Sequence, residues 1–283
     1  MTRALPLRIR ECLLAASAGA ALLLIGPPAL AQSVTDGLNQ RFWVQVGAYR
    51  PDIDSEVRVD QRAGAFTGTN LRLEQELGLP DRKTLVSLLA GMRIDSRWRA
   101  EFEYFSLKRS GRQDPLGGPV IVGDTAFAAE IDGRFDTRVY RASAGYSFVR
   151  SPQVEIGGTL GLHITDFQVS LAGTGTVNGR PVAVAVEEEQ RTVPLPTVGI
   201  YAGLALTPSW VLSGRADVFK MKLRGDDGQL LNLQANLVYR MTPNIGLGVG
   251  YRYNDYRVEG NGSFKGRVDY RYGGPQAFVE VGF

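Results

Sequence analysis

The sequence contains a single cysteine, Cys12, and it lies close to the N-terminus. In this N-terminal segment three arginines precede the apolar run LLAASAGAALLLIG, and a small-residue site ends at Ala31. A basic start, a short apolar run and a small-residue cleavage site make up a secretory signal peptide. We therefore predict a signal peptide at residues 1–31 and one mature domain at 32–283, with neither a thiol nor a disulfide bond.

Long hydrophobic runs and a strong excess of one charge are also missing from the mature domain. No stretch of about 18 consecutive apolar residues follows residue 31, which argues against a transmembrane helix. The predicted signal carries three Arg and one Glu, so the chain's 32 basic and 29 acidic residues become 29 and 28. A balanced charge removes the main support for nucleic-acid binding, and we expect no nucleic-acid partner.

What recurs instead is an alternation of apolar and polar residues over segments of about ten residues. In NIGLGVGYRYND, Ile245, Leu247 and Val249 share one face, while glycines and Arg252 share the other. The chain has 34 glycines, many of them inside such strands, where glycine normally weakens pairing unless a small side chain is required. A soluble β-sandwich also alternates, but its solvent face would carry long charged side chains and little glycine. The pattern therefore predicts an all-β fold, an antiparallel transmembrane β-barrel with a cramped polar lumen.

The turns predict the number of strands. Short connections occur at Asp95-Ser96, Ser151-Pro152, Thr207-Pro208 and Thr242-Pro243. Short turns belong on the periplasmic side of such barrels and longer loops on the outside, which we expect at about 51–83, 110–134, 167–191 and 259–273, with a tight turn near 225–228. Ten strands follow, from Arg41 to Phe283. Eight or twelve strands are the alternatives. Twelve would follow if residues 55–61 and 69–77, which alternate well, formed an extra hairpin, but we interpret them as strand extensions beyond the bilayer.

The chain ends inside a strand, PQAFVEVGF, with Ala277, Val279, Val281 and Phe283 on one face. An open edge of this kind would invite aggregation in a soluble domain, whereas in a closed barrel it pairs with the first strand near Arg41. Aromatic residues beside the predicted periplasmic ends indicate an interfacial girdle. They are Phe42, Trp43, Trp98, Phe148, Trp210 and Tyr239.

Inward projection of the strands predicts a polar network in the lumen, with both charges in similar numbers. Its members are Arg93, Arg99, Glu101, Glu103, Arg141, Glu155, His163, Arg215, Asp217, Arg240, Arg252 and Glu280. Long side chains of opposite charge should cross a narrow barrel and pair, which gives a filled lumen in place of a hydrophobic core. A small polar pore through the same network is the alternative.

Catalytic and metal chemistry find little support in the residue pattern. His163 is the only histidine, and of its neighbours Thr165 shares its face without the serine of outer-membrane lipases, while Asp166 points away. We expect no cofactor and no metal site, because a lone histidine without cysteine cannot bind a transition metal by itself. Acidic residues expected outside could share divalent cations with lipopolysaccharide phosphates, although a solvated loop is the favoured interpretation. These are Glu187 to Glu189, Glu74, Glu76, Asp226 and Asp227.

The signal peptide, the alternating segments and the terminal Phe283 resemble the small outer-membrane β-barrel proteins of Gram-negative bacteria. More narrowly, GTNLRLEQELGLPD, WRAEFEYFSLKRSG and FDTRVYRASAGYSF are similar to a set of mostly uncharacterised proteobacterial barrels. The resemblance implies contact with outer-membrane lipid and lipopolysaccharide, and insertion by the barrel-assembly machinery, which would read Phe283, Val281 and Val279. It implies no catalytic residue. We expect first a structural or surface-interaction role, second a narrow porin-like channel, and third a lipid- or peptide-hydrolysing enzyme.

Overall fold

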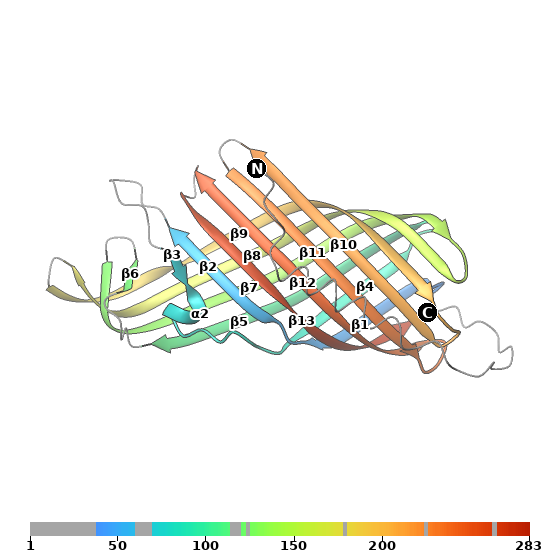
Figure 1. Cartoon of the computed structure of the whole chain (residues 1–283), viewed down its shortest axis with the longest axis horizontal. Coiled ribbons are helices and arrows are strands. Elements are labelled where there is room, and N and C mark those ends of the chain that lie inside the picture. The colour runs from blue at the N-terminus through green and yellow to red at the C-terminus, as the bar shows by residue number, and fades with distance from the viewer. Residues whose placement is uncertain are drawn as a thin grey trace, which may run out of the picture. The chain divides into compact units, whose positions relative to one another are not determined.

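The computed structural model describes residues 38–59, 70–113, 120–122, 125–177, 180–223, 226–261 and 265–283. Within the compact unit Thr35–Phe283, ten of the described strands run antiparallel and close into a barrel (Figure 1). In barrel order they are β1 (Phe42–Tyr49), β4 (Leu85–Arg93), β5 (Trp98–Gln113), β7 (Thr125–Arg150), β8 (Val154–Val177), β9 (Arg180–Ala205), β10 (Trp210–Leu223), β11 (Asp226–Arg240), β12 (Ile245–Asn261) and β13 (Lys265–Gly282). The predicted antiparallel barrel of ten strands is confirmed.

The first and last strands close the barrel. β1 pairs with β13 from Trp43 opposite Gly282 to Tyr49 opposite Gln276. At the chain end, Phe283 N donates to Phe42 O at 2.9 Å, and Arg41 N donates to Phe283 O at 2.6 Å. The prediction that the terminal segment pairs with the strand near Arg41 is therefore confirmed, and the last strand has no open edge here.

All four short turns lie where the sequence predicts them, and they share one local device. The first turn residue offers a side-chain oxygen to the backbone N–H groups two and three positions later. In the β4–β5 turn, Asp95 Oδ1 accepts from Arg97 N at 2.7 Å and Trp98 N at 2.8 Å. Hydroxyl oxygens of Ser151, Thr207 and Thr242 do the same in the other three turns. Proline follows each of these hydroxyl residues, which presets the turn.

The outer face next to these turns is an apolar belt contributed by all ten strands. Exposed members include Val46, Leu88, Phe102, Phe148, Leu160, Ile200, Leu212, Tyr239, Val249 and Val279. Phe42, Trp98, Phe148, Trp210 and Tyr239 are exposed, as the prediction of an aromatic girdle requires. For Trp43 it is wrong: alternation turns this residue inward, where it is 8% exposed. No helix among the described residues has the length and apolar character needed to cross a membrane.

Several strands are much longer than a bilayer requires. β7 and β9 have 26 residues each and β8 has 24, whereas a tilted strand crosses with about 9–11. Most of the predicted outer loops at 110–134 and 167–191 is therefore strand, and so are the ends of the predicted loop at 259–273, because alternation continues beyond the apolar belt. The side chains of Glu187 to Glu189 and of Asp226 lie outside the described residues.

The first long connection contains two short strands and one helical turn. β2 (Asp52–Val59) continues the line of β1 along β13, with Asp52 opposite Gly273. β3 (Asn70–Arg72) pairs back onto β2, and α2 (Leu73–Glu76) follows at once. The strand-extension prediction is thus right for β2 and wrong after Arg72, because Leu73 and Leu77 are buried on one side of a helical turn. A further short strand, β6 (Val120–Val122), pairs with β7.

Candidate functional site: the barrel lumen

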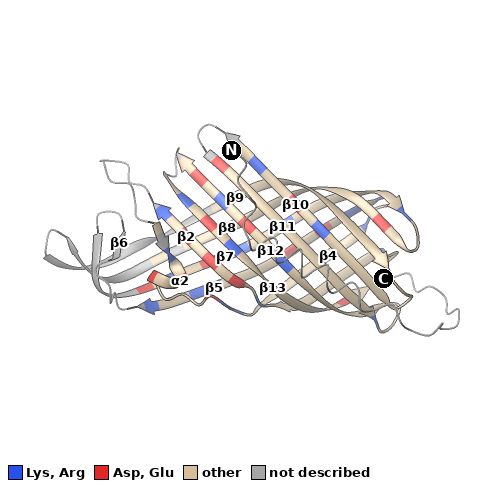
Figure 2. Ribbon diagram, in the orientation of Figure 1, with Lys and Arg blue, Asp and Glu red and all other residues tan. Residues whose placement is uncertain are grey.

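All twelve residues predicted to face the lumen have their side chains inside the barrel. Eleven of them are buried or have side chains no more than 10% exposed, and Arg99 is the most accessible at 18%. They come from β4, β5, β7, β8, β10, β11, β12 and β13. Figure 2 shows that acidic and basic positions are interleaved along the strands. Strand alternation alone therefore places this set on the inner face.

Nine of the twelve form one continuous chain of ion pairs. Its first half joins Arg93 to Glu155 at 2.6 Å, Glu155 to Arg99 at 3.7 Å, and Arg99 to Glu101. Its second half runs from Glu101 through Arg215, Asp217, Arg141 and Glu103 to Arg252. Each carboxylate in this chain contacts two guanidinium groups, so negative charge in the lumen is neutralised locally.

Several of these pairs cross the lumen between strands that are not neighbours. Arg215 on β10 reaches Glu101 on β5 at 2.6 Å, and Arg93 on β4 reaches Glu155 on β8 with two hydrogen bonds of 2.8 and 2.6 Å. Such bidentate pairs combine charge with fixed geometry. The ion pairs therefore brace opposite walls of the barrel and occupy its cross-section.

Neutral side chains add further hydrogen bonds to one carboxylate of this chain. Asp217 also accepts from Thr159 Oγ1 at 3.0 Å and from Asn232 Nδ2 at 2.9 Å. Gly199 lies against this carboxylate, and an added Cβ would stand 2.2 Å from Asp217 Oδ1. Here the close approach explains why a strand residue is glycine, as the sequence pattern suggested.

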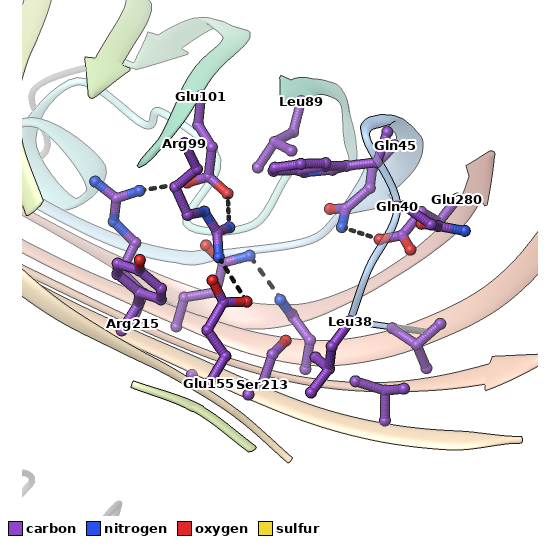
Figure 3. A pocket seen from close by; sticks show the side chains of 18 of the residues that line it. Leu38, Gln40, Gln45, Leu89, Arg99, Glu101, Glu155, Ser213, Arg215 and Glu280 are labelled. Carbon is purple, nitrogen blue, oxygen red and sulfur yellow. Dashed lines mark hydrogen bonds and ion pairs between the residues drawn. The ribbon is translucent and has the colours of Figure 1, made fainter. Parts of the chain in front are cut away.

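Arg240 and Glu280 form a second ion pair nearer the four short turns. Glu280 also accepts from Gln45 Nε2 at 2.5 Å, and Arg240 donates to Gln40 Oε1 at 3.1 Å. A cavity of about 120 Å³ lies between this pair and the ion-pair chain, and Leu38 lines it together with Arg99 and Glu101 (Figure 3). The lumen therefore contains a polar space on this side.

His163 is held by an aromatic neighbour and has no catalytic partner in contact. Its Nε2 forms a hydrogen bond with the Tyr256 hydroxyl, which also lies 2.9 Å from Thr165 Oγ1. Asp166 faces outward and accepts from Thr192 Oγ1 at 2.6 Å. The predicted orientation of both neighbours is confirmed, and no hydrogen bond joins His163 to a carboxylate among the described residues.

The half of the lumen away from the short turns is filled mainly by apolar and aromatic side chains, which the sequence-based prediction of a polar lumen did not anticipate. Buried aromatic side chains from six strands pack with ring centroids 4.9–6.5 Å apart. They are Tyr49, Phe105, Phe135, Phe167, Tyr256, Tyr270 and Tyr272. Alternation of Val268, Tyr270 and Tyr272 is the signal that could have revealed this cluster, but it lies in a segment predicted to be a loop.

The segment around α2 covers this aromatic cluster. Leu73, Leu77 and Leu79 are 2–3% exposed and belong to the same apolar core. Gly78 adopts a positive φ of 61°, and Gly111 on β5 lies so close that an added Cβ would be 2.4 Å from the Gly78 carbonyl oxygen. We call residues 73–79 the cap. Both glycines are required by its close contact with the barrel wall.

A buried ion pair that sequence reasoning missed anchors the cap. Arg109, 1% exposed, donates to Glu74 Oε1 at 2.5 Å and to Ser55 Oγ at 2.6 Å. Ser55 N donates to the second Glu74 oxygen at 3.0 Å. Both interpretations of Glu74, the favoured solvated loop and the alternative of a surface ligand for divalent cations, are therefore wrong, because its carboxylate is already occupied inside the barrel. Among the described residues, no group of three or more His, Cys, Asp or Glu side chains could hold a metal ion.

The chain was compared with known protein families, curated proteins and solved structures. No protein-family model and no curated protein matches the chain. Among solved structures it is similar to Neisserial surface protein A, with 18% identity, 86% of this chain and 97% of that chain covered, and a TM-score of 0.31. A Pseudomonas aeruginosa FadL homologue has 9% identity, coverage of 87% and 90%, and a TM-score of 0.40. The translocator domain of the autotransporter NalP from Neisseria meningitidis has 13% identity, coverage of 97% and 98%, and a TM-score of 0.39.

These similarities are too low to transfer any activity. The assignment rests on the barrel itself: ten antiparallel strands, a closed seam between β1 and β13, and an apolar outer belt. The chain has the fold of a Gram-negative outer-membrane β-barrel.

Proposed function

We propose that this protein is an integral outer-membrane β-barrel with a filled lumen and a structural or surface-interaction role. The observation that carries the proposal is the succession of side chains along the lumen: an ion-pair chain, an aromatic cluster, and the cap. An ion that entered would have to break paired charges and then cross an apolar layer, and both steps are unfavourable. The predicted signal peptide, with cleavage after Ala31, supports export to the outer membrane.

Conductance across a planar bilayer tests this proposal. The purified protein should insert without producing steady single-channel steps. Stepwise currents in the wild-type protein that change in Arg252→Ala or Glu103→Ala would show a conducting path through the ion-pair chain and overturn the proposal. Migration on SDS gels before and after boiling checks that each preparation is folded.

A narrow channel for small polar solutes is the second candidate. The cavity of about 120 Å³ beside Arg99 and Glu101 supports it, since this space is polar and lies near the short turns. The aromatic cluster and the cap lie between this cavity and the other end of the barrel. A conducting protein would therefore need the cap to move, and a variant lacking residues 73–79 should conduct more than wild type only if this candidate is right.

An enzymatic role is the third candidate and has the least support. His163 contacts Tyr256 and carries no orienting acid, and no serine nucleophile lies within the contacts described for it. Chromogenic ester and peptide substrates should therefore be hydrolysed no faster than in buffer. Hydrolysis by the folded protein that is lost in His163→Ala would reverse this ranking.

Lipopolysaccharide is the lipid partner that we propose for the outer surface. Lys83 and Lys108 are exposed on adjoining segments, with Lys83 Nζ donating to the Lys108 carbonyl oxygen, and Arg138 projects outward from β7. They lie above Tyr104 and Tyr140, whose rings are 5.1 Å apart. Basic groups above an aromatic pair suit a phosphorylated lipid at the membrane interface. Alanine at all three basic positions should weaken lipopolysaccharide binding in native mass spectrometry, whereas Arg97→Ala in a periplasmic turn should not; equal binding by both variants would contradict the site.

A further inference from the structure

The barrel wall is incomplete between β9 and β10. Their pairing runs from Ala205 opposite Val211 to Val198 opposite Val218 and ends there. Both strands continue, β9 back to Arg180 and β10 forward to Leu223, yet no pairing joins 180–197 to 219–223 within these described segments. β8 accompanies β9 as far as Val177 opposite Arg180, and β11 accompanies β10 as far as Leu223 opposite Asp226. The wall thus separates into two intact sheets above Val198, and Figure 1 shows β10 and β11 turning away from β8 and β9.

Two prolines explain why the pairing ends at this point. Pro194 and Pro196 keep their places opposite Ile164 and Leu162 on β8, although proline has no N–H to donate. In an antiparallel ladder this requires that their nitrogens face away from β8, toward β10. Pro196 and Pro194 therefore occupy the next two positions at which β9 would donate to β10. The sequence itself stops the ladder and blunts the edge against further strand pairing.

The opening leads to the apolar half of the lumen. Leu195 is buried in the aromatic cluster, and Val193 and Phe219 are partly buried against the same cluster. Val193 and Leu195 lie on the β9 edge, and Phe219 lies on the β10 edge directly after the last pair. The surface that lines the two separated edges is therefore hydrocarbon and aromatic.

The opening begins at the upper rim of the apolar belt. Val198 and Val218, which form the last pair, are 55% and 49% exposed on the outer face. The next outward side chain on β10 is the exposed Lys220. A similar gap above the start of β4 is covered, because Lys83 bonds to the Lys108 carbonyl oxygen and Ile53 N donates to Asp81 O at 2.7 Å. The β9–β10 gap has no such cover among the described residues.

We propose that the β9–β10 gap is a lateral binding site for one hydrocarbon chain of an anionic lipid of the outer leaflet. The chain would lie against Val193, Leu195 and Phe219, with its headgroup beside Lys220. The apolar lining, the position at the belt's rim and the exposed Lys220 together fit this occupant. The inference rests on the proposed membrane location and adds a ligand to it.

Engineered cysteine pairs test whether the wall is open. If pairing continued, Thr197 would lie directly opposite Phe219 as a non-hydrogen-bonded pair, the kind of pair in which the two side chains are closest. Ala205 and Val211 form a pair of the same kind. Thr197→Cys is a mild change, because its buried hydroxyl has no hydrogen-bond partner among the described residues. The Ala205→Cys/Val211→Cys control should form a disulfide in air, while Thr197→Cys/Phe219→Cys should keep two free thiols. Equally rapid disulfide formation by both pairs would overturn the opening.

Photo-labelling in lipid vesicles tests the ligand. The probe is phosphatidylglycerol with a diazirine on one acyl chain, incorporated into phosphatidylethanolamine vesicles that hold the folded protein. Labelling should concentrate on peptides with residues 192–197 and 219–221, and Phe219→Ser with Val193→Ser should remove that excess. Labelling spread evenly over the outward face would show only annular lipid and overturn the site.

The matched control is Leu212→Ser with Leu204→Ser, a paired position on the outer face of the same two strands. This control variant should keep the labelling at 192–197 and 219–221 unchanged. If the labelling is lost in the control variant too, the site is not specific. The proposed membrane location has a separate readout. Protein that fails to partition into vesicles at all contradicts the proposed function, whereas inserted protein without this labelling contradicts only the lateral site.

Discussion

Arg109 on β5 and Glu74 in the cap meet inside the barrel with their side-chain atoms 2.5 Å apart, although the two residues lie 35 positions apart in the sequence. The guanidinium also lies over the Phe135 ring, with 5.2 Å to the centroid. One buried ion pair thus joins the cap, the barrel wall and the aromatic cluster.

Glu74→Gln should strongly destabilise the folded barrel. It leaves Arg109 buried without its carboxylate, and the loss of one partner of a buried pair costs about 3–5 kcal/mol. Urea unfolding in lipid vesicles, followed by tryptophan fluorescence, measures the change. Glu76→Gln in the same helical turn is the control, because Glu76 is only half-buried, and it should change stability little.

The paired replacement separates the charge from the packing. Glu74→Leu combined with Arg109→Met should be closer to wild type than either single variant, since an apolar pair avoids the uncompensated charge. Additive losses in the double variant would mean that the two residues do not act together, contrary to the geometry of the cap.

Alternation predicted the inner face well, and its limits have physical reasons. It placed Asp217 and the other charged residues correctly because a strand residue can face only in or out. Trp43 was assigned to the outer girdle because it lies near the turn. Its neighbours Phe42 and Val44 face outward, so alternation turns Trp43 inward. Tyr270 and Arg109 were missed because alternation does not say how far a strand extends, nor that a later segment folds back against it. The β9–β10 gap was not predicted. Its signal in the sequence is the pair Pro194 and Pro196, which lie two positions apart on β9 and therefore face the same neighbouring strand.

Asp217→Asn should destabilise the protein by about 3–5 kcal/mol, because Arg141 and Arg215 both lose their shared carboxylate inside the lumen. Asp166→Asn is a matched control on the outer face, where the carboxylate is accessible to water and its loss should matter little. The midpoint of urea unfolding gives both values. Similar losses in the two variants would indicate that Asp217 is not part of a desolvated network.

The β4–β5 turn should contribute stability that depends on pH. Hydrogen bonds from the backbone N–H groups of Arg97 and Trp98 lower the pKa of Asp95 below its usual value. A lowered pKa in the folded state means that the contribution is complete above the unfolded value of about 4 and is lost as the pH falls through the folded pKa. Asp95→Ser keeps an acceptor like that of the other three turns but does not titrate. Unfolding measured from neutral pH to below about pH 3 should show a smaller acid-induced loss in Asp95→Ser than in wild type, and parallel curves would contradict this role.

Phe283→Ala should slow assembly in the outer membrane while leaving the stability of the assembled barrel nearly unchanged. The Phe283 side chain is 71% exposed, whereas its backbone closes the seam through hydrogen bonds with Arg41 and Phe42 that alanine can also make. If the exposed Phe283 side chain contributes little to packing but is required for assembly, it acts during insertion of the barrel. The measurement is the fraction of newly made protein that becomes heat-modifiable on SDS gels in cells, compared with urea unfolding of purified, refolded protein. Phe148→Ala removes an equally outward aromatic at 61% exposure and should not slow assembly. If both variants assemble at the wild-type rate, Phe283 carries no assembly signal.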